Sequence, residues 1–262
     1  MELWLVRDVS VWLVGAVLII GVPAVTLGLD ILIHRTLPHR RLNQHNDVTG
    51  VIVSLVGVAY AIVIGLCVVS LWEGYTDAKE AVREEAASMT TLIPGSVVFD
   101  DQTRLMLTDG VIRYESALVT DWEARHEQGT ERERSADLSE LATLVGSLRP
   151  TTDAQRFFIN HAIDEIGRAE QYHHASDAEA DDSRMSPVMW FGVLVSTGAV
   201  LTMCLFFGLD DGLVRRALLT MASTVIATNL FLVVEMNYPY YGSFAVTPDA
   251  YQSVVDDLRQ DR

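Results

Sequence analysis

The sequence predicts an all-α integral membrane protein, with four transmembrane helices in two hairpins and a helical extramembrane domain inserted between spans 2 and 3. Of the 262 residues, 50% are hydrophobic, yet the formal net charge is −16. Apolar and acidic residues must therefore occupy separate segments. Crossing the hydrocarbon core of a bilayer takes about 20 apolar residues. Uncharged apolar runs near this length occur at Val9–Leu29, Val48–Trp72, Met185–Leu209 and Ala217–Val234.

Residues 1–72 form the predicted first hairpin, whose spans are joined by the basic turn HRTLPHRRLNQHND. The residues before the first run lack the small-residue cleavage site of a signal peptide, so we expect a membrane anchor. Asn46 and Asp47 precede the second span, where their side-chain oxygens can cap its first turn. An anion bound at this positive helix end is the alternative interpretation.

The second span changes from apolar to charged at Glu73 with no proline or turn cluster at the switch. Helical hydrogen bonds need no break at a membrane surface, so we expect one helix to continue from the bilayer to about Met89. Its membrane part carries a stripe of small residues at every fourth position, typical of close helix packing in lipid. The stripe consists of Gly57, Ala61 and Gly65.

Ser54, Val58 and Ile62 follow the same spacing on another face of this helix. Copies of that face from several subunits could surround an axial pore, with apolar rings as a gate and Glu73 at the mouth. A single chain with four spans is too small to enclose such a pore. The pore hypothesis therefore requires a homo-oligomer.

Residues 73–184 form the predicted acidic extramembrane domain. Apolar residues recur there at helical spacing while charged residues fill the other faces, which predicts three or four helices. The apolar positions are Ala81, Ala86, Met89 and Ile93, and then Leu105, Ile112, Leu118 and Trp122. Thr152 and Gln155 have the spacing of a capping box.

Residues 185–235 form the predicted second hairpin, with Ser186 as the helix cap, Pro187 at the first helical position, and a short turn GLDDGLVRR. Residues 236–262 form a C-terminal segment with a short helix that opens at Thr247–Pro248. Tyrosines early in this segment are expected at the membrane interface. They are Tyr238, Tyr240 and Tyr241.

Ionisable residues within or beside a membrane span are candidates for function. Asp30 lies near the end of the first span, and Glu73 and Glu235 flank the second and fourth spans. Their positions near span ends also allow a simpler interpretation, in which each carboxylate reaches water at the interface.

His173, His174 and Asp177 are weak candidates for a metal site or a pH sensor before the third span. Adjacent histidines point to different helix faces, so we predict no metal site and interpret the segment as a solvated acidic helix end. Cys67 and Cys204 lie inside spans and have neither disulfide nor metal spacing. No catalytic motif or cofactor-binding motif is present, which predicts a non-enzyme without a cofactor. The negative charge excludes nucleic acid as a partner.

Three segments resemble the bacterial bestrophin-like domain family. HNDVTGVIVSLVGVAYAIVIGLCVVSLWEGYTDAKEAVREEA resembles its second membrane helix, RMSPVMWFGVLVSTGAVLTMCLFFG its third span, and NYPYYGSFAVTPDAYQSVV its closing segment. True bestrophins are pentameric anion channels whose second helix has an apolar neck followed by a W-x-x-Y stretch, similar to Trp72–Tyr75. The resemblance implies a homo-oligomer, with five subunits, that passes small inorganic anions across the bacterial inner membrane.

The resemblance places the neck at Ser54, Val58 and Ile62, although channel necks have larger residues than Ser54. Asn237 and Tyr240 stand where the family more often has Asp and Phe, and no counterpart of the animal calcium-binding acidic cluster follows the last span. A negative domain repels chloride, which favours a competing function. In that alternative the protein is a non-conducting membrane scaffold or sensor whose acidic domain binds a partner.

Two arguments disagree about orientation in the membrane. Both short turns are basic, and the positive-inside rule places them in the cytoplasm and the acidic domain outside. Their arginines are Arg35, Arg40 and Arg41 in one and Arg215 and Arg216 in the other. Resemblance to bestrophins implies instead that the helical domain is cytosolic, so the orientation stays open.

Overall fold

The computed structural model describes residues 9–36, 46–128, 135–182, 185–206, 211–241 and 245–260. All regular structure within these ranges is helical. Among the described residues, four helices are long and apolar enough to cross a membrane. They are α2 (Val11–Thr36), α4 (Asn46–Thr90), α9 (Pro187–Leu205) and α10 (Gly212–Met236). The predicted all-α class and the four spans are confirmed.

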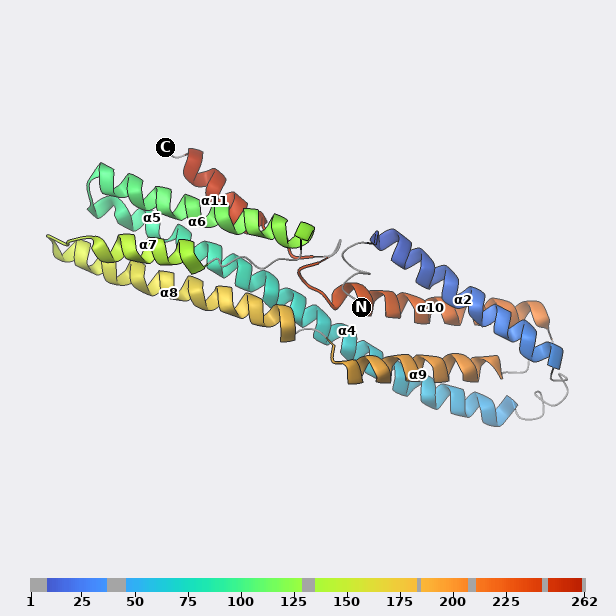
Figure 1. Cartoon of the computed structure of the whole chain (residues 1–262). Coiled ribbons are helices and arrows are strands. Elements are labelled where there is room, and N and C mark those ends of the chain that lie inside the picture. The colour runs from blue at the N-terminus through green and yellow to red at the C-terminus, as the bar shows by residue number, and fades with distance from the viewer. Residues whose placement is uncertain are drawn as a thin grey trace. The chain divides into compact units, whose positions relative to one another are not determined.

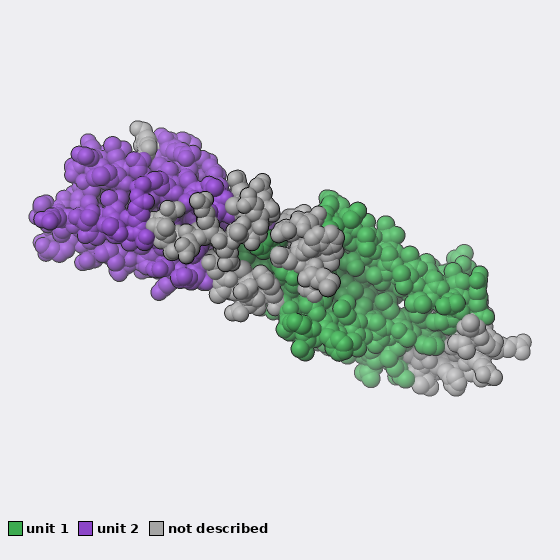
Figure 2. All heavy atoms as spheres, in the orientation of Figure 1, with its two compact units in different colours: residues 1–74, 183–244 green, residues 75–182, 245–262 purple. Residues whose placement is uncertain are grey.

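The chain folds into two compact units, which Figure 2 colours separately. Unit 1 comprises residues 1–74 and 183–244, and unit 2 comprises residues 75–182 and 245–262. The boundary between Gly74 and Tyr75 falls inside α4, so a single helix contributes residues to both units. The prediction that the second span continues as a helix to about Met89 is confirmed, because α4 ends at Thr90.

Unit 1 is built around α10. The first span, α2, packs along α10, as Figure 1 shows. One face of α4 shares an apolar core with α9 and α10. This core contains Tyr60, Ile64, Cys67 and Leu71 from α4, Val193 and Val200 from α9, and Ile226, Leu230 and Val233 from α10. The Tyr60 hydroxyl also lies 3.1 Å from Thr197 Oγ1 of α9. Every helix of the unit thus packs on at least one other.

The start of α9 and the end of α10 are joined by side-chain hydrogen bonds. Ser186 caps α9, accepting a bond from the Met189 N–H, and Pro187 occupies the first turn as predicted. The Met185 N–H donates to Asn237 Oδ1 at 2.7 Å, and Asn237 is 1% exposed. Tyr238 and Tyr240 are buried within the same unit. The chain after α10 therefore turns inward at Asn237, and the place of these tyrosines at the membrane interface stays a prediction.

Two membrane-spanning helices are longer than the uncharged runs that predicted them, because each includes charged residues at one end. The fourth span begins at Gly212 and not Ala217, with Asp211 capping it by accepting bonds from the Leu213 and Val214 N–H groups. Arg215 and Arg216, predicted in the connecting turn, are therefore helical. Similarly, α2 continues past Asp30 to Thr36. The predicted runs end at the first charged residue. The helices continue past it, because a charged side chain is tolerated where it has a partner or reaches water.

Unit 2 is a bundle of helices. It contains the end of α4, α5 (Leu92–Gly95), the 3-10 helix η1 (Ser96–Val98), α6 (Asp101–Gln128), α7 (Ser135–Ser147), α8 (Asp153–Asp182) and α11 (Asp249–Gln260). α6 packs against both α7 and α11, and α7 packs against α8 (Figure 1). The capping box predicted at the start of α8 is confirmed, because Thr152 and Gln155 exchange hydrogen bonds.

Most of the predicted core of unit 2 is buried. Ala81, Ala86, Met89, Ile112, Leu118 and Trp122 are all less than 9% exposed. Two predicted positions are not buried, because Ile93 is partly exposed and Leu105 is 51% exposed. The buried stripe of α6 passes through Leu107, and a residue two positions away lies about 200° around a helix. Leu105 thus points away from the helices that cover Leu107.

We predict that Leu118→Ala destabilises unit 2 while Leu105→Ala does not. Leu118 is 0% exposed, so its truncation removes buried contacts and leaves a cavity. Such substitutions cost about 2–5 kcal/mol. Thermal melts of the purified protein, followed by circular dichroism, should show a clear decrease in melting temperature for Leu118→Ala alone. Equal decreases for the two variants would show that the register of α6 is wrong.

Candidate functional sites

The residues predicted to line a pore lie on an uncovered face of α4. Val58 is 60% exposed and Ile62 is 58% exposed. Successive helical residues are about 100° apart, so Val58 lies about 200° from buried Tyr60 and Ile62 about 200° from buried Ile64. Ser54 shares this exposed face, and its hydroxyl donates to the Gly50 carbonyl at 2.8 Å. This face therefore points away from the rest of unit 1.

The small-residue stripe of α4 also lacks a neighbour among the described residues of this chain. A Cβ built at Gly57 or Gly65 would meet no heavy atom within 4 Å, and Ala61 is exposed. Glu73, predicted at the pore mouth, is exposed as well. The side chains of Asn46 and Asp47 lie outside the described part of the structure. No packing of the stripe thus occurs within the described chain.

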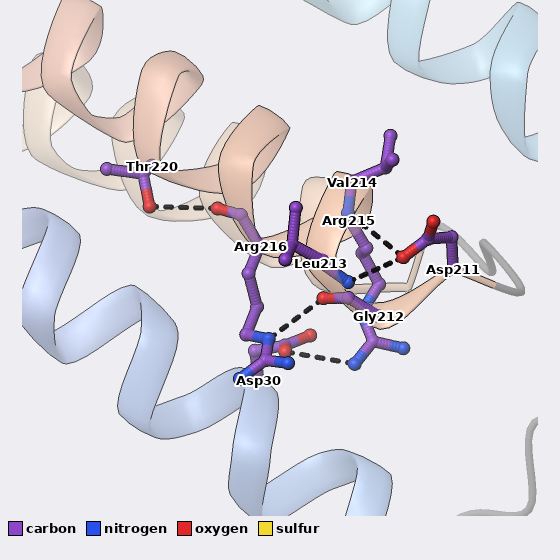
Figure 3. Close-up of polar contacts among 8 residues, drawn as sticks. All are labelled: Asp30, Asp211, Gly212, Leu213, Val214, Arg215, Arg216 and Thr220. Atoms are coloured by element: carbon purple, nitrogen blue, oxygen red, sulfur yellow. Dashed lines mark hydrogen bonds and ion pairs between the residues drawn. The ribbon is translucent and has the colours of Figure 1, made fainter.

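A buried ion pair joins the first and fourth spans (Figure 3). Arg215 Nη2 of α10 donates to Asp30 Oδ2 of α2 at 3.1 Å, and the two residues are 6% and 0% exposed. Arg216 is exposed and bonds only to its own helix in Figure 3, where its Nε donates to the Gly212 carbonyl at 2.8 Å. Asp30 was a predicted candidate, but its partner was missed because Arg215 was assigned to a turn.

Glu235 is buried like Asp30 and unlike Glu73. It is 3% exposed, near the end of α10, whereas Glu73 is exposed. The interpretation that such carboxylates simply reach water is therefore wrong for Asp30 and Glu235. A carboxyl group buried in a membrane unit is costly and is retained where it has a structural or functional use.

Unit 2 contains a second buried polar cluster, centred on Glu85 of α4. Glu85 is 0% exposed. The Tyr114 hydroxyl of α6 donates to its Oε1 at 2.7 Å, and the Tyr251 hydroxyl of α11 donates to its Oε2 at 2.6 Å. Nδ1 of His173 on α8 lies 3.2 Å from Oε1. One carboxylate thus binds side chains from three other helices, which fixes their positions around α4.

Glu115 of α6 lies in the same cluster without a hydrogen bond. It is 0% exposed, and neither carboxyl oxygen has a partner in the described structure. Burial, and to a smaller extent the charge on Glu85, raises the pKa of Glu115 well above its usual range. Burial also raises the pKa of Tyr251, whose hydroxyl remains a donor. The arrangement favours a protonated Glu115.

The two predicted metal candidates that the structure describes do not form a metal site. The His173 and His174 rings are 6.1 Å apart at 56°, and His173 faces Glu85. Both rings, with Glu170, line a cavity of about 200 Å³ between α6, α7 and α8. The Asp177 side chain lies outside the described residues. Among those described, no group of three His, Cys, Asp or Glu side chains has the geometry to hold a metal ion.

Sequence reasoning missed Glu85 and Glu115 because it assigned acidic residues on these helices to solvent. A signal was present, however. Glu85 lies three residues after Val82 and four before Met89, which are both buried, so it occupies the apolar stripe of its helix. Glu115 lies in the corresponding position on α6, between Val111 and Leu118.

Comparisons with known proteins agree with this architecture. A family model described as Bestrophin-like domain matches residues 20–251. The chain is also similar to crystal structures of singly substituted forms of a bacterial bestrophin homologue from Klebsiella pneumoniae. One has a TM-score of 0.69 at 13% identity and another 0.67 at 12%, each covering 92% of this chain and 98% of that chain. A crystal structure described only as a variant membrane protein gives a TM-score of 0.64 at 14% identity, covering 92% and 97%. A search of curated proteins found no match.

We predict that Arg215→Leu strongly destabilises the protein, whereas Arg216→Leu does not. Removing Arg215 leaves Asp30 as a buried charge without its counterion, and breaking such a pair costs about 3–5 kcal/mol. Arg216 is exposed and serves as the matched control. Thermal unfolding in detergent, with size-exclusion chromatography, measures both effects. The double variant Asp30→Leu with Arg215→Leu should recover much of the loss, and no recovery would contradict the role of this pair.

Proposed function

The chain belongs to the bestrophin-like domain family, and from this premise we propose that it forms a homo-oligomeric ion channel whose pore is lined by α4. The observation that carries the proposal is the uncovered face of α4. Val58 and Ile62 are more than half exposed although they lie in the middle of an apolar helix. A face that is not used inside the chain is available to line a pathway between several copies of it.

The small-residue stripe supports assembly through the same helix. From the 100° spacing of helical residues, Ala61 lies about 100° from Tyr60 and about 100° from Ile62. Ala61 therefore occupies a flank of α4, between the face that packs in unit 1 and the proposed pore face, while Gly65, seven residues after Val58, lies about 20° from it and borders the pore face. Small residues on a flank allow a neighbouring subunit's helix to approach closely. We propose a ring of subunits, with five as the number implied by the family.

The proposed pathway has an apolar neck at Val58 and Ile62, with the hydroxyl of Ser54 beside it and Glu73 beyond it. Apolar constrictions gate by excluding water, and charged rings beside them select ions. We propose small inorganic anions as the conducted ions and the bacterial inner membrane as the location. The net charge of −16 favours a specific second candidate, a non-conducting scaffold or sensor whose acidic domain binds a partner.

Ion flux from liposomes that contain the purified protein tests the channel. We expect a chloride gradient to drive flux, and Val58→Trp and Ile62→Trp each to reduce it at least tenfold, because an indole fills the narrow neck. Val195→Trp on α9 is the control, since Val195 is 54% exposed but lies on another helix. This variant should conduct like the wild type.

Parallel measurements with potassium gradients identify the conducted ion. Selective potassium flux would overturn the proposed anion selectivity while keeping the pore on α4. The absence of ion flux with monodisperse, folded wild-type protein would contradict the channel proposal and favour the scaffold or sensor. Flux that survives both tryptophan variants would place the pathway elsewhere.

A further inference from the structure

We propose that Glu115 and Glu85 form a buried proton-binding site in unit 2, and that loss of its proton weakens the packing of α11. The site takes a proton as its ligand and does not depend on whether the protein conducts ions. Its basis is the geometry of two carboxyl groups within one enclosed cluster. Glu85 has all of the hydrogen-bond donors, and Glu115 has none.

The unpartnered state of Glu115 points to the proton. Its carboxyl group is 0% exposed, and both oxygens lack hydrogen bonds within the described structure. An ionised carboxylate in this environment would lack both solvent and donors, which is among the most costly arrangements in a protein interior. A protonated carboxyl group is uncharged, and its burial costs far less. The site thus keeps Glu115 neutral as long as a proton is available.

The groups that face the pair are Tyr114 of α6, Tyr251 of α11 and His173 of α8. Of these three, His173 is the side chain that can carry a positive charge, and its contact is with Glu85. On α7, the exposed Glu140 is paired with Arg113 at the surface. Farther along α8, Glu165 pairs with Arg168. Among the described residues, no lysine or arginine forms an ion pair with either buried carboxyl group.

A route for the proton is present at His173. This residue contacts Glu85 and also lines the cavity of about 200 Å³ that Glu170 and His174 share. Its side chain is 15% exposed. An imidazole exchanges protons at physiological pH, so His173 can pass a proton between the cavity and the buried pair.

Loss of the proton acts on α11 because this helix depends on the cluster. α11 packs against α6, and Tyr251 donates directly to Glu85 while its ring contacts Trp122 edge-on at 6.1 Å. Ionised Glu115 would place a second negative charge beside the first. Water then has to enter to solvate both charges, and the short α11 is the element that moves to admit it.

The direction of the pH dependence follows from the raised pKa of Glu115 in the folded protein. At low pH, Glu115 holds a proton in both the folded and the unfolded chain, and the site does not oppose folding. As the pH rises above the unfolded value, the unfolded chain loses its proton first, so the free energy of unfolding decreases. The decrease is complete once the pH exceeds the pKa of the folded state.

The test combines infrared spectroscopy and hydrogen exchange on the full-length protein in nanodiscs. Around neutral pH, the infrared spectrum of the wild type minus that of Glu115→Gln should show the carbonyl band of a protonated carboxylic acid. This difference band should disappear as the pH is raised. Over the same pH range, amide protection in α11, corrected for the intrinsic exchange rate, should decrease at least tenfold in the wild type and stay constant in Glu115→Gln.

Two further variants complete the design. Glu84→Gln changes an exposed glutamate next to Glu85 on α4 and should match the wild type in both measurements. Glu85→Gln removes the neighbouring charge, so the band should disappear at lower pH than in the wild type. If Glu115→Gln does not fold, the spectrum of each protein at high pH serves as its own reference, and the comparison of the wild type with Glu85→Gln tests the proposal.

Three results would overturn the proposal. The first is the absence of the difference band at neutral pH, which would show that Glu115 is ionised. The second is an equal loss of α11 protection in Glu115→Gln, which would assign the pH response to another group. The third is a band in Glu85→Gln that disappears at the same pH as in the wild type, which would show that the two carboxyl groups are independent.

Discussion

The unbroken hydrogen bonding of the α4 backbone is the constraint on which both units depend. Hydrocarbon offers no partners to a backbone, so each N–H and C=O in a span must bond within the protein. A helix meets this condition on both sides of a membrane surface, and α4 continues from Asn46 to Thr90 without a proline. Before the boundary at Gly74, α4 contributes Tyr60 and Ile64 to the core of unit 1; after it, the helix contributes Glu85 and Met89 to unit 2.

The two units accommodate buried charge by different physical means. In unit 1, Asp30 is neutralised by Arg215, an opposite charge held at 3.1 Å. In unit 2, Glu85 is stabilised by two tyrosine hydroxyls and a histidine, whereas the neighbouring Glu115 has no hydrogen-bond partner among the described residues, and we propose that it retains a proton. Charge-assisted hydrogen bonds are about twice as strong as neutral ones. They can therefore fix a helix position, whereas the ion pair fixes a contact between two spans.

The sequence was sufficient for the class of the protein and for its membrane spans, because hydrophobic length is a strong and local signal. The extension of α4 beyond Trp72 was predictable from the absence of a breaker. The caps at Ser186 and Thr152 were predictable from side-chain chemistry alone. These features all depend on residues that are close in the sequence.

Features that depend on distant residues could not be predicted. Arg215 looked like part of a basic turn until the structure placed it beside Asp30, and Glu115 looked like a solvated residue until the structure showed it to be buried. The inward turn at Asn237 likewise requires Met185, which is far away in the sequence. The proposed pore face could not be predicted for a different reason, because a pore between subunits depends on copies of the chain other than the one described.

Chemical accessibility of cysteines on α4 tests the central claim, that this helix borders a water-filled pathway, most directly. In a background with Cys67 and Cys204 replaced by alanine, Val58→Cys and Val195→Cys would each be exposed in liposomes to a charged, water-soluble thiol reagent. If α4 lines a pathway, the reagent should modify Val58→Cys far faster than the control Val195→Cys on α9, which is exposed to a similar extent in the single chain. Equally slow modification of both would show that the exposed face of α4 meets lipid or protein, and the account of a pore on this helix would be wrong.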